Sequence, residues 1–402
     1  MSITGRSGDG TATARGEERR AMIVACGAHA LHDGFTDLIY VMLPVWQGEF
    51  GLSFAALGLM KTVFSGALAG FQVPSGFLAE RFGARTVLAL GTALAGIGYV
   101  FGGLSVGVAT LVAALFVGGL GASTQHPLGS ALVAQAFAGA RSRTALGTYN
   151  FAGDLGKMSV PALASLLLLA LPWRQALMLL GALGMLGAVL IFVLMPRLGE
   201  AAPAAHKEIN ARATGGLHAL GFPLLLSVGV IDSATRMAFL TFLPFVLTAK
   251  GASVQTVGLS LTLVFAGGAA GKLVCTFIGA RLGTVATVWL TEGVTALGIV
   301  ALLPLSLDSA LLLLPVVGVA LNGTSSVLYG SVPDLVTSEK RTRAFGIFYT
   351  GTIGAGAVSP ALYGLLGDAF GVPTALVVVA AIVLVTLPLT LMLRPALAAR
   401  PT

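Results

Sequence analysis

Charged side chains stand inside long apolar stretches of this sequence. They are Asp33, Asp37, Lys61, Asp154, Lys157, Asp232, Arg236, Lys272 and Glu292. Each would cost roughly 3 kcal/mol at the centre of a bilayer if it faced lipid. We therefore expect most of them to pair with one another or to line a wet cavity. In such a place carboxylates can exchange protons and basic groups can hold anions.

The spacing of the polar residues predicts that they share helix faces, because residues three and four apart lie on the same side of a helix. Three stripes follow from this rule: His29, His32, Asp33, Thr36, Asp37 and Tyr40; Asn150, Asp154 and Lys157; Asp232 and Arg236. We expect the first and third stripes to meet, with further cavity residues at His126, Lys272, Asn322 and Tyr329.

Roles follow from these residue types. Asp33 is expected to bind and release a proton, with Asp37, His126 and Asp154 as further proton-coupling candidates. The remaining polar residues are expected to bind substrate: His29, His32, Tyr40, Asn150, Lys157, Asp232, Arg236, Lys272, Asn322 and Tyr329. Asp154 with Lys157, and Asp232 with Arg236, could equally be internal ion pairs. Lys61 is expected to reach the lipid headgroups, and Glu292 to have a structural partner.

Composition places these residues in a membrane protein. The chain has 402 residues, is 56% hydrophobic and only 10% charged, which is far too little charge for a soluble surface of this size. Twelve apolar stretches are long enough to span a bilayer: 22–46, 53–77, 86–105, 108–135, 144–171, 176–196, 217–247, 254–278, 284–305, 309–332, 343–367 and 371–394.

The net charge is +7, and the basic residues are distributed unevenly among the loops. Lys and Arg concentrate in the tails and alternate loops, whereas the other loops hold only Arg174 and Lys250. This bias predicts that both termini and the central loop are cytoplasmic. It also leaves no clustered basic face for a nucleic acid.

The two halves of the chain repeat each other. Landmarks recur at an offset of 200 and then 199: Leu43-Pro44 and Leu243-Pro244, Gly51 and Gly251, Arg81 and Arg281, Gly83 and Gly283, Pro161 and Pro360. Duplicated bundles of this kind are typical of secondary transporters. The predicted divisions are a disordered tail at 1–20, six-helix bundles at 21–196 and 217–396, and a cytoplasmic linker at 197–216.

A loop motif follows the second stretch, with the sequence Gly76-Phe77-Leu78-Ala79-Glu80-Arg81-Phe82-Gly83-Ala84-Arg85. Its charges could pair with neighbouring helix ends and so latch one access state, or they could only set topology. The predicted latch residues are Gly76, Glu80, Arg81, Gly83, Arg85 and Arg281.

This motif resembles the loop signature of the major facilitator superfamily. Within it, His29-x-x-His32-Asp33, Glu49 to Phe54 and His126-Pro127 most resemble the fosmidomycin-resistance group of drug exporters. The resemblance implies a twelve-helix fold and proton-driven export of a small compound. The charges of Gly153-Asp154-Leu155-Gly156-Lys157 depart from that group and leave the substrate open.

We therefore expect an all-α membrane protein of two six-helix bundles, monomeric and in a bacterial inner membrane. It would export a small organic, anionic or zwitterionic compound in exchange for protons. An importer or exchanger of organic anions is the nearest alternative, and a receptor or scaffold that transports nothing is a second. Neither an enzyme nor any cofactor is expected, because the sequence has no phosphate-binding loop or recognisable nucleophile. No metal site is expected, since the five His residues are scattered along the chain.

Overall fold

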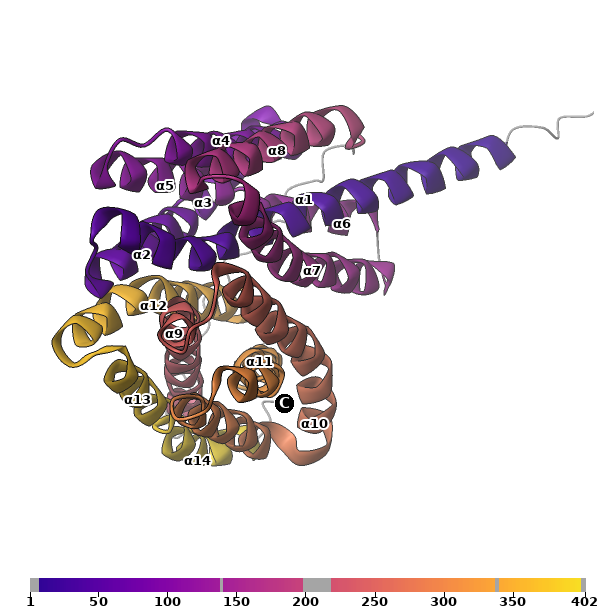
Figure 1. Cartoon of the computed structure of the whole chain (residues 1–402). Helices are drawn as coiled ribbons and strands as arrows, with labels where there is room; N and C mark the ends of the chain where they lie inside the picture. Colours follow the sequence, from indigo (N-terminus) through magenta and orange to yellow (C-terminus); the bar gives the residue numbers. More distant parts are fainter. Residues whose placement is uncertain (1–6, 138–139, 198–217, 337–339, 399–402) are drawn as a thin grey trace, which may run out of the picture. The chain divides into compact units, whose positions relative to one another are not determined.

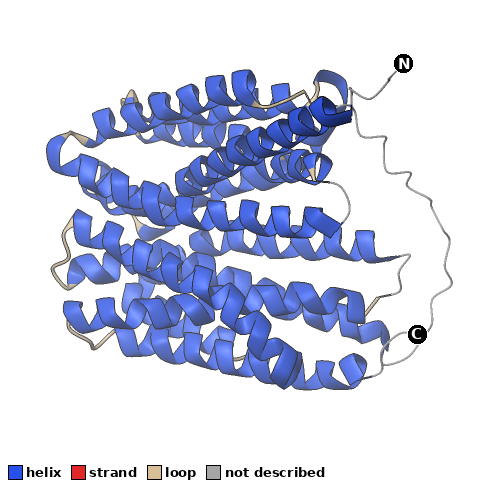
Figure 2. Cartoon of the chain, turned by 90° about the vertical axis from the view of Figure 1, so that its right-hand side faces the viewer, coloured by secondary structure: helices blue, strands red, loops and turns tan. Residues whose placement is uncertain are grey.

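The structure is a computed structural model, and it describes residues 7–137, 140–197, 218–336 and 340–398. The described residues contain helices and no strand (Figures 1 and 2). The helices are α1 Ser7–Phe50, α2 Phe54–Gly70, α3 Gln72–Phe82, α4 Ala84–Gly103, α5 Val108–Ala122, α6 Gln125–Ala136, α7 Ala140–Ala170, α8 Trp173–Leu194, α9 His218–Ala249, α10 Val254–Leu302, α11 Leu307–Ser331, the short 3₁₀ helix η1 Val332–Asp334, α12 Arg341–Phe370, α13 Val372–Val383 and α14 Thr386–Ala398.

These helices account for the predicted membrane spans. Within the described residues, nine helical segments are long and apolar enough to cross a membrane, and the pair α2 and α3, bent by 42°, makes a tenth. Helices α1 and α12 occupy the predicted first and eleventh spans. The predicted all-α fold with twelve spans is therefore confirmed.

The N-terminal segment differs from its prediction. Helix α1 begins at Ser7, so the first helix continues through residues 7–20, where the sequence predicts a disordered tail. Two contacts fix the last part of this segment. Arg141 makes two hydrogen bonds of 2.9 Å to Glu18, and the Arg20 side chain donates to the carbonyl of Leu194. Most of the predicted linker at 197–216 lies outside the described residues.

Helices break or bend near a proline, which cannot donate a backbone hydrogen bond, and at glycines with positive φ. The predicted fourth span divides into α5 and α6 at Ser123 and Thr124. Pro127 explains this break, because it has no N–H to donate to the preceding turn. Gly83 separates α3 from α4 with φ +82°, and its repeat partner Gly283 bends α10 with φ +78°. Such φ values are costly for any residue with a Cβ.

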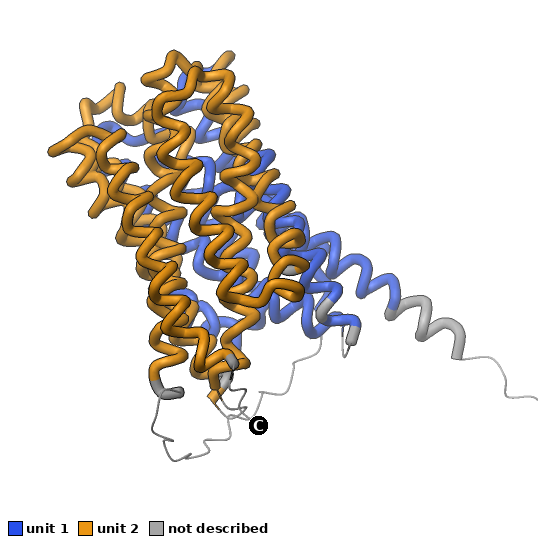
Figure 3. The backbone as a smooth tube through the Cα atoms, turned by 90° about the horizontal axis from the view of Figure 1, so that it is seen from below, with its two compact units in different colours: residues 1–38, 70–160, 171–204 blue, residues 39–69, 161–170, 205–402 orange. Residues whose placement is uncertain are grey.

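The helices divide into two compact units that are not the two sequence halves (Figure 3). Unit 1 comprises residues 1–38, 70–160 and 171–204, and unit 2 comprises residues 39–69, 161–170 and 205–402. Each has its own apolar core. The core of unit 1 surrounds Tyr149 and Leu88, and a core of unit 2 surrounds Phe348 and Leu328. Unit 2 thus includes segments of the first half, from α1, α2 and α7.

Two equivalent close contacts explain how these segments pack inside unit 2. Gly58 of α2 lies against the carbonyl of Pro360 in α12, and Gly258 of α10 lies against Ser165 and the carbonyl of Pro161 in α7. A Cβ at either glycine would overlap those atoms. Because Gly58 and Gly258 are repeat partners, as are Pro161 and Pro360, the same helix contact occurs twice with the halves exchanged.

Candidate functional site

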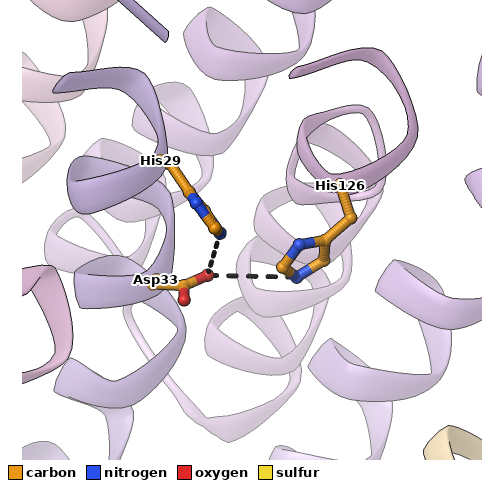
Figure 4. Close-up of side chains that lie close together, drawn as sticks. All are labelled: His29, Asp33 and His126. Carbon is orange, nitrogen blue, oxygen red and sulfur yellow. Dashed lines mark ion pairs between the residues drawn. The ribbon is translucent and has the colours of Figure 1, made fainter. Parts of the chain in front are cut away.

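Three histidines and a lysine surround the Asp33 carboxylate in unit 1. Atom Oδ1 lies 3.4 Å from His29 Nε2, 3.8 Å from His32 Nε2 and 3.9 Å from His126 Nε2. Figure 4 shows His29 and His126 pointing at Asp33 from two different helices. His29, His32 and Asp33 are buried, whereas 45% of the His126 side chain is exposed. The cluster is therefore closed on the α1 side and accessible at His126.

Helix α7 completes the cluster by approaching α1 closely. A Cβ at Gly156 would overlap the carbonyl of Ala30, and one at Gly153 would overlap Asp33 and His29. These two glycines, three residues apart, are thus required for the close approach. The approach brings Lys157 Nζ to 3.4 Å from Asp33 Oδ2. The departure from the exporter motif in this segment therefore supplies a counter-ion for Asp33.

The hydrogen bond of His29 fixes where its proton lies. His29 Nδ1 is 2.8 Å from the backbone carbonyl of Tyr149, which can only accept, so Nδ1 carries the hydrogen. In the neutral ring, Nε2 is then an acceptor, and it faces the carboxylate oxygen of Asp33. Two acceptors at this distance repel each other unless a proton is bound to one of them. The His29–Asp33 contact is therefore a place where one proton can be held in a buried setting.

The same cluster corrects the expectation that the histidines are scattered, because three of the five converge on Asp33. The ligand atoms of His29, Asp33 and His126 lie within 4.8 Å of one another, close enough to hold a metal ion. Lys157 opposes that use, since its ammonium contacts the same carboxylate and would repel a cation there. The charge arrangement suits a proton and a small anionic or zwitterionic group better.

A second polar cluster lies in unit 2, around Asp232 in α9. A cavity of about 20 Å³, enough for a water molecule, is lined by Gly229, Asp232, Ser233, Arg236, Ser325, Leu328, Tyr329, Phe348 and Thr352. The predicted ion pair between Asp232 and Arg236 is not formed: within the described chain, no carboxylate oxygen lies within 4.0 Å of the Arg236 side chain. Asp232 and Glu292 are both buried in unit 2.

The remaining predicted site residues differ in their burial and in their contacts. Asp37 and Asp154 are buried in unit 1, and Asn150 is exposed. In unit 2, Tyr40 donates to Met237 Sδ at 3.3 Å, so the end of α1 contacts α9. Asn322 donates to the carbonyl of Gly318 in its own helix. Lys272 is half-buried in α10 and is not among the residues that line the cavity.

The predicted latch residues make few contacts with described side chains. Glu80 and Arg81 are exposed, and no ion pair of Glu80 is formed with the described part of the chain. Arg85 donates to the carbonyl of Met195 at 3.1 Å and lies over the Phe192 ring. Arg281 lies over Phe277. Gly76 is half-buried in α3. Among the described residues, this conformation therefore has no latch contact through Glu80.

Two buried charges, Lys61 and Glu292, lie in surroundings that differ from those predicted. Lys61 was expected at the headgroups, but it is 1% exposed, with Nζ 4.5 Å from the centre of the Tyr40 ring. Glu292 was expected to have a structural partner; it is 1% exposed, and its Oε1 has no hydrogen-bond partner among the described residues. Neither residue belongs to one of the three polar stripes that helical spacing predicted. A single charged residue inside an apolar stretch was the only sequence signal for these two positions, because such residues are costly in a membrane and usually have a role.

Comparison with known proteins agrees with this architecture. A family model described as Major Facilitator Superfamily matches residues 25–225 and 225–402. The chain is 25% identical over 352 residues to the fosmidomycin resistance protein of Escherichia coli strain K12, covering 85% of this chain and 84% of that protein. It is 31% identical over 178 residues to the cephamycin export protein CmcT of Amycolatopsis lactamdurans.

That second match covers 44% of this chain and only 37% of the export protein, so it spans well under half of that relative. Among solved structures, the fold is similar to a bacterial homolog of the human lysosomal transporter Spinster in an inward-facing and occupied conformation. The TM-score is 0.80 at 14% identity, covering 96% of this chain and 99% of the other.

Proposed function

Because the chain belongs to the Major Facilitator Superfamily, we propose that this multi-pass membrane transporter exports a small organic compound in exchange for protons. The observation that carries the proposal is the buried contact of His29, Asp33 and Lys157, where a carboxylate paired with Lys157 can take up one proton and donate it to His29. The protein would act as a monomer in a bacterial inner membrane, with both termini and the linker 197–216 cytoplasmic. The bundles at 21–196 and 217–396 would rock against each other.

Asp33 has two chemical states in this arrangement. As a carboxylate it is neutralised by Lys157, and as an acid it releases Lys157 and can donate to His29. A cargo with a positive group would compete with the proton for Asp33, while its negative group could be held by Lys157. Competition for one site is what exchange transport requires, because cargo and proton then occupy it in turn. A zwitterionic cargo meets this requirement best.

His126 offers the route by which protons reach the buried pair. It is the most exposed member of the cluster, and its Nε2 lies 3.9 Å from the same Asp33 oxygen. An imidazole can accept a proton at one nitrogen and release one at the other. We propose that His126 relays protons between the accessible side and Asp33, while His29 and His32 hold the carboxylate in place.

Uptake of fosmidomycin and of a cephamycin into everted membrane vesicles tests this proposal. Wild type should accumulate at least one of the two, and a protonophore should abolish the accumulation. Asp33→Asn should also abolish it, because the amide can no longer gain or lose a proton in this range. Asp308→Asn, at an exposed acid in the first turn of α11, is the matched control and should transport normally. Accumulation that survives both the protonophore and Asp33→Asn would reject the proton coupling.

An importer of organic anions on the same fold remains the second candidate, and one observation favours it. Arg236 in the cavity of unit 2 has no described carboxylate within 4.0 Å, so its charge is available to an anion. The pH dependence of binding separates the two functions. Cargo that competes with a proton binds more tightly as pH rises, whereas an anion bound together with a proton binds more weakly.

A further inference from the structure

The cavity of unit 2 occupies the position in the second repeat that the Asp33 cluster occupies in the first. Three of its lining residues are repeat partners of cluster residues at the offset of 200: Gly229 of His29, Asp232 of His32, and Ser233 of Asp33. At the offset of 199, Phe348 and Thr352 are the partners of Tyr149 and Gly153, which lie against His29. The repeat has therefore produced two related sites, one in each unit.

The residue types of the second site differ from those of the first. The described residues that line the cavity include no histidine and no lysine. Gly356 stands at the repeat position of Lys157, and a Cβ there would overlap Ser233 Oγ. The second site therefore cannot repeat the chemistry of a carboxylate held between imidazoles and a lysine. The charged side chains that line it are those of Asp232 and Arg236.

Asp232 and Arg236 present one group of each charge to the same cavity. They lie four residues apart in α9 and therefore on one helix face. Yet these two described side chains have no N···O distance of 4.0 Å or less. Asp232 is 4% exposed and Arg236 is half-buried. Because buried charges are stable only when they are paired, two separated opposite charges match a ligand that carries both charges and can pair with both at once.

The size of the cavity limits what can enter it. A volume of about 20 Å³ accommodates a compact polar group but no ring or chain. Asp232 and Thr352 are buried and form a closed floor. Arg236, Ser325 and Tyr329 are partly exposed, so the cavity can be reached from their side. A charged head group can therefore enter beside Arg236, while the rest of the ligand stays outside.

Aromatic side chains lie at that accessible side. The Tyr329 ring, which lines the cavity, is 4.6 Å from the Tyr349 ring and 5.0 Å from the Phe348 ring. Tyr349 is 50% exposed, so part of its ring is open to contact. Aromatic rings pack favourably against other rings and against apolar groups. The part of the ligand that remains outside the cavity is therefore expected to be apolar or aromatic.

We propose that this cavity binds the head group of a zwitterionic compound with an apolar or aromatic body, such as an aromatic amino acid. Arg236 donates hydrogen bonds to the carboxylate of the ligand, and Asp232 accepts hydrogen bonds from its ammonium group. The proposal names a class of cargo for the proposed exporter, so its role in transport rests on that function. Binding of the ligand in the cavity does not depend on proton exchange.

Calorimetry of three probes with the purified full-length protein tests this proposal. Phenylalanine carries both charges near neutral pH, phenylpropionate carries only the negative charge, and phenethylamine carries only the positive charge. Wild type should bind phenylalanine roughly tenfold more tightly, or better, than either of the other two, because each of those leaves one buried charge without a partner. This comparison uses wild type alone, so it does not depend on the folding of any variant.

Two near-isosteric variants assign the binding to this cavity. Arg236→Gln should reduce the affinity for phenylalanine to about that for phenethylamine, because the carboxylate loses its partner. Asp232→Asn should reduce it to about that for phenylpropionate, because the ammonium group loses its partner. Asp308→Asn, at an exposed acid in the first turn of α11, is the matched control and should bind phenylalanine as wild type does.

Two results would overturn the proposal. The first is wild-type protein that binds phenylalanine no more tightly than one of the singly charged probes, or that binds none of the three. The second is an affinity for phenylalanine that is unchanged in both Arg236→Gln and Asp232→Asn, which would place the binding elsewhere. Neither measurement involves transport or a proton gradient, so failure of the export proposal would not affect the result.

Discussion

Replacing Gly58 with alanine tests the helix contact that the repeat creates. The new Cβ would overlap the carbonyl of Pro360, which is backbone and cannot rotate away. Overpacking of this kind typically costs about 1–3 kcal/mol. The matched control is Gly66→Ala in the same helix, where nothing lies within 4 Å of the added Cβ. There alanine should be neutral or stabilising by up to about 1 kcal/mol, because glycine is the poorer helix former.

The two variants should therefore separate by about 1–4 kcal/mol, the sum of both effects at their extremes. Thermal unfolding of the purified proteins should show Gly58→Ala below wild type and Gly66→Ala at or above it. A cost of about 1–3 kcal/mol also disfavours the conformation with this contact by roughly 5- to 150-fold. Transport should fall in Gly58→Ala if the cycle must pass through that conformation. Equal melting temperatures for the two variants would refute the reasoning.

Three further predictions concern other parts of the chain. Asp368 accepts hydrogen bonds from the Phe54 and Ala55 backbone N–H groups at 2.6 and 2.9 Å. Asp368→Ala should therefore lower stability by about 0.5–2 kcal/mol in thermal unfolding, and an unchanged melting temperature would contradict the capping role. Arg236→Gln should weaken binding of anionic ligands at least tenfold in calorimetry if the cavity receives anions, and unchanged affinity would exclude that use. Glu18 is bonded to Arg141, which lowers the pKa of Glu18. The Glu18–Arg141 pair should therefore be intact at any pH above the ordinary pKa of Glu, and it should be lost only as pH falls through the lowered pKa. Carboxyl NMR should show that Arg141→Gln returns the titration of Glu18 to its usual pH.

The sequence predicted the class of fold because its strongest signals are local. Apolar length fixes each span, and Gly83 and Gly283 fix their turns through a backbone that other residues avoid. Pro127 likewise marks the break in the fourth span. The stripe of α1 correctly brought His29, His32 and Asp33 to one helix face, since helical spacing needs no tertiary information.

Partners across helices could not be predicted in the same way. Lys157 was expected either to pair with Asp154 or to bind substrate, but the close approach of α7 to α1 places it on Asp33. Asp232 was expected either to pair with Arg236 or to bind substrate, and no carboxylate of the described residues lies within 4.0 Å of the Arg236 side chain. Such choices depend on which backbones can approach, and small residues such as Gly156 decide that only in the folded protein.

The most direct test of proton exchange is to follow protons and cargo together in liposomes that contain the purified protein and an internal pH-sensitive dye. With fosmidomycin or a cephamycin inside, dilution into cargo-free buffer should acidify the liposome interior as the compound leaves, and Asp33→Asn should show no acidification. Exit of the compound with no change of internal pH, or with alkalinisation, would contradict exchange with protons.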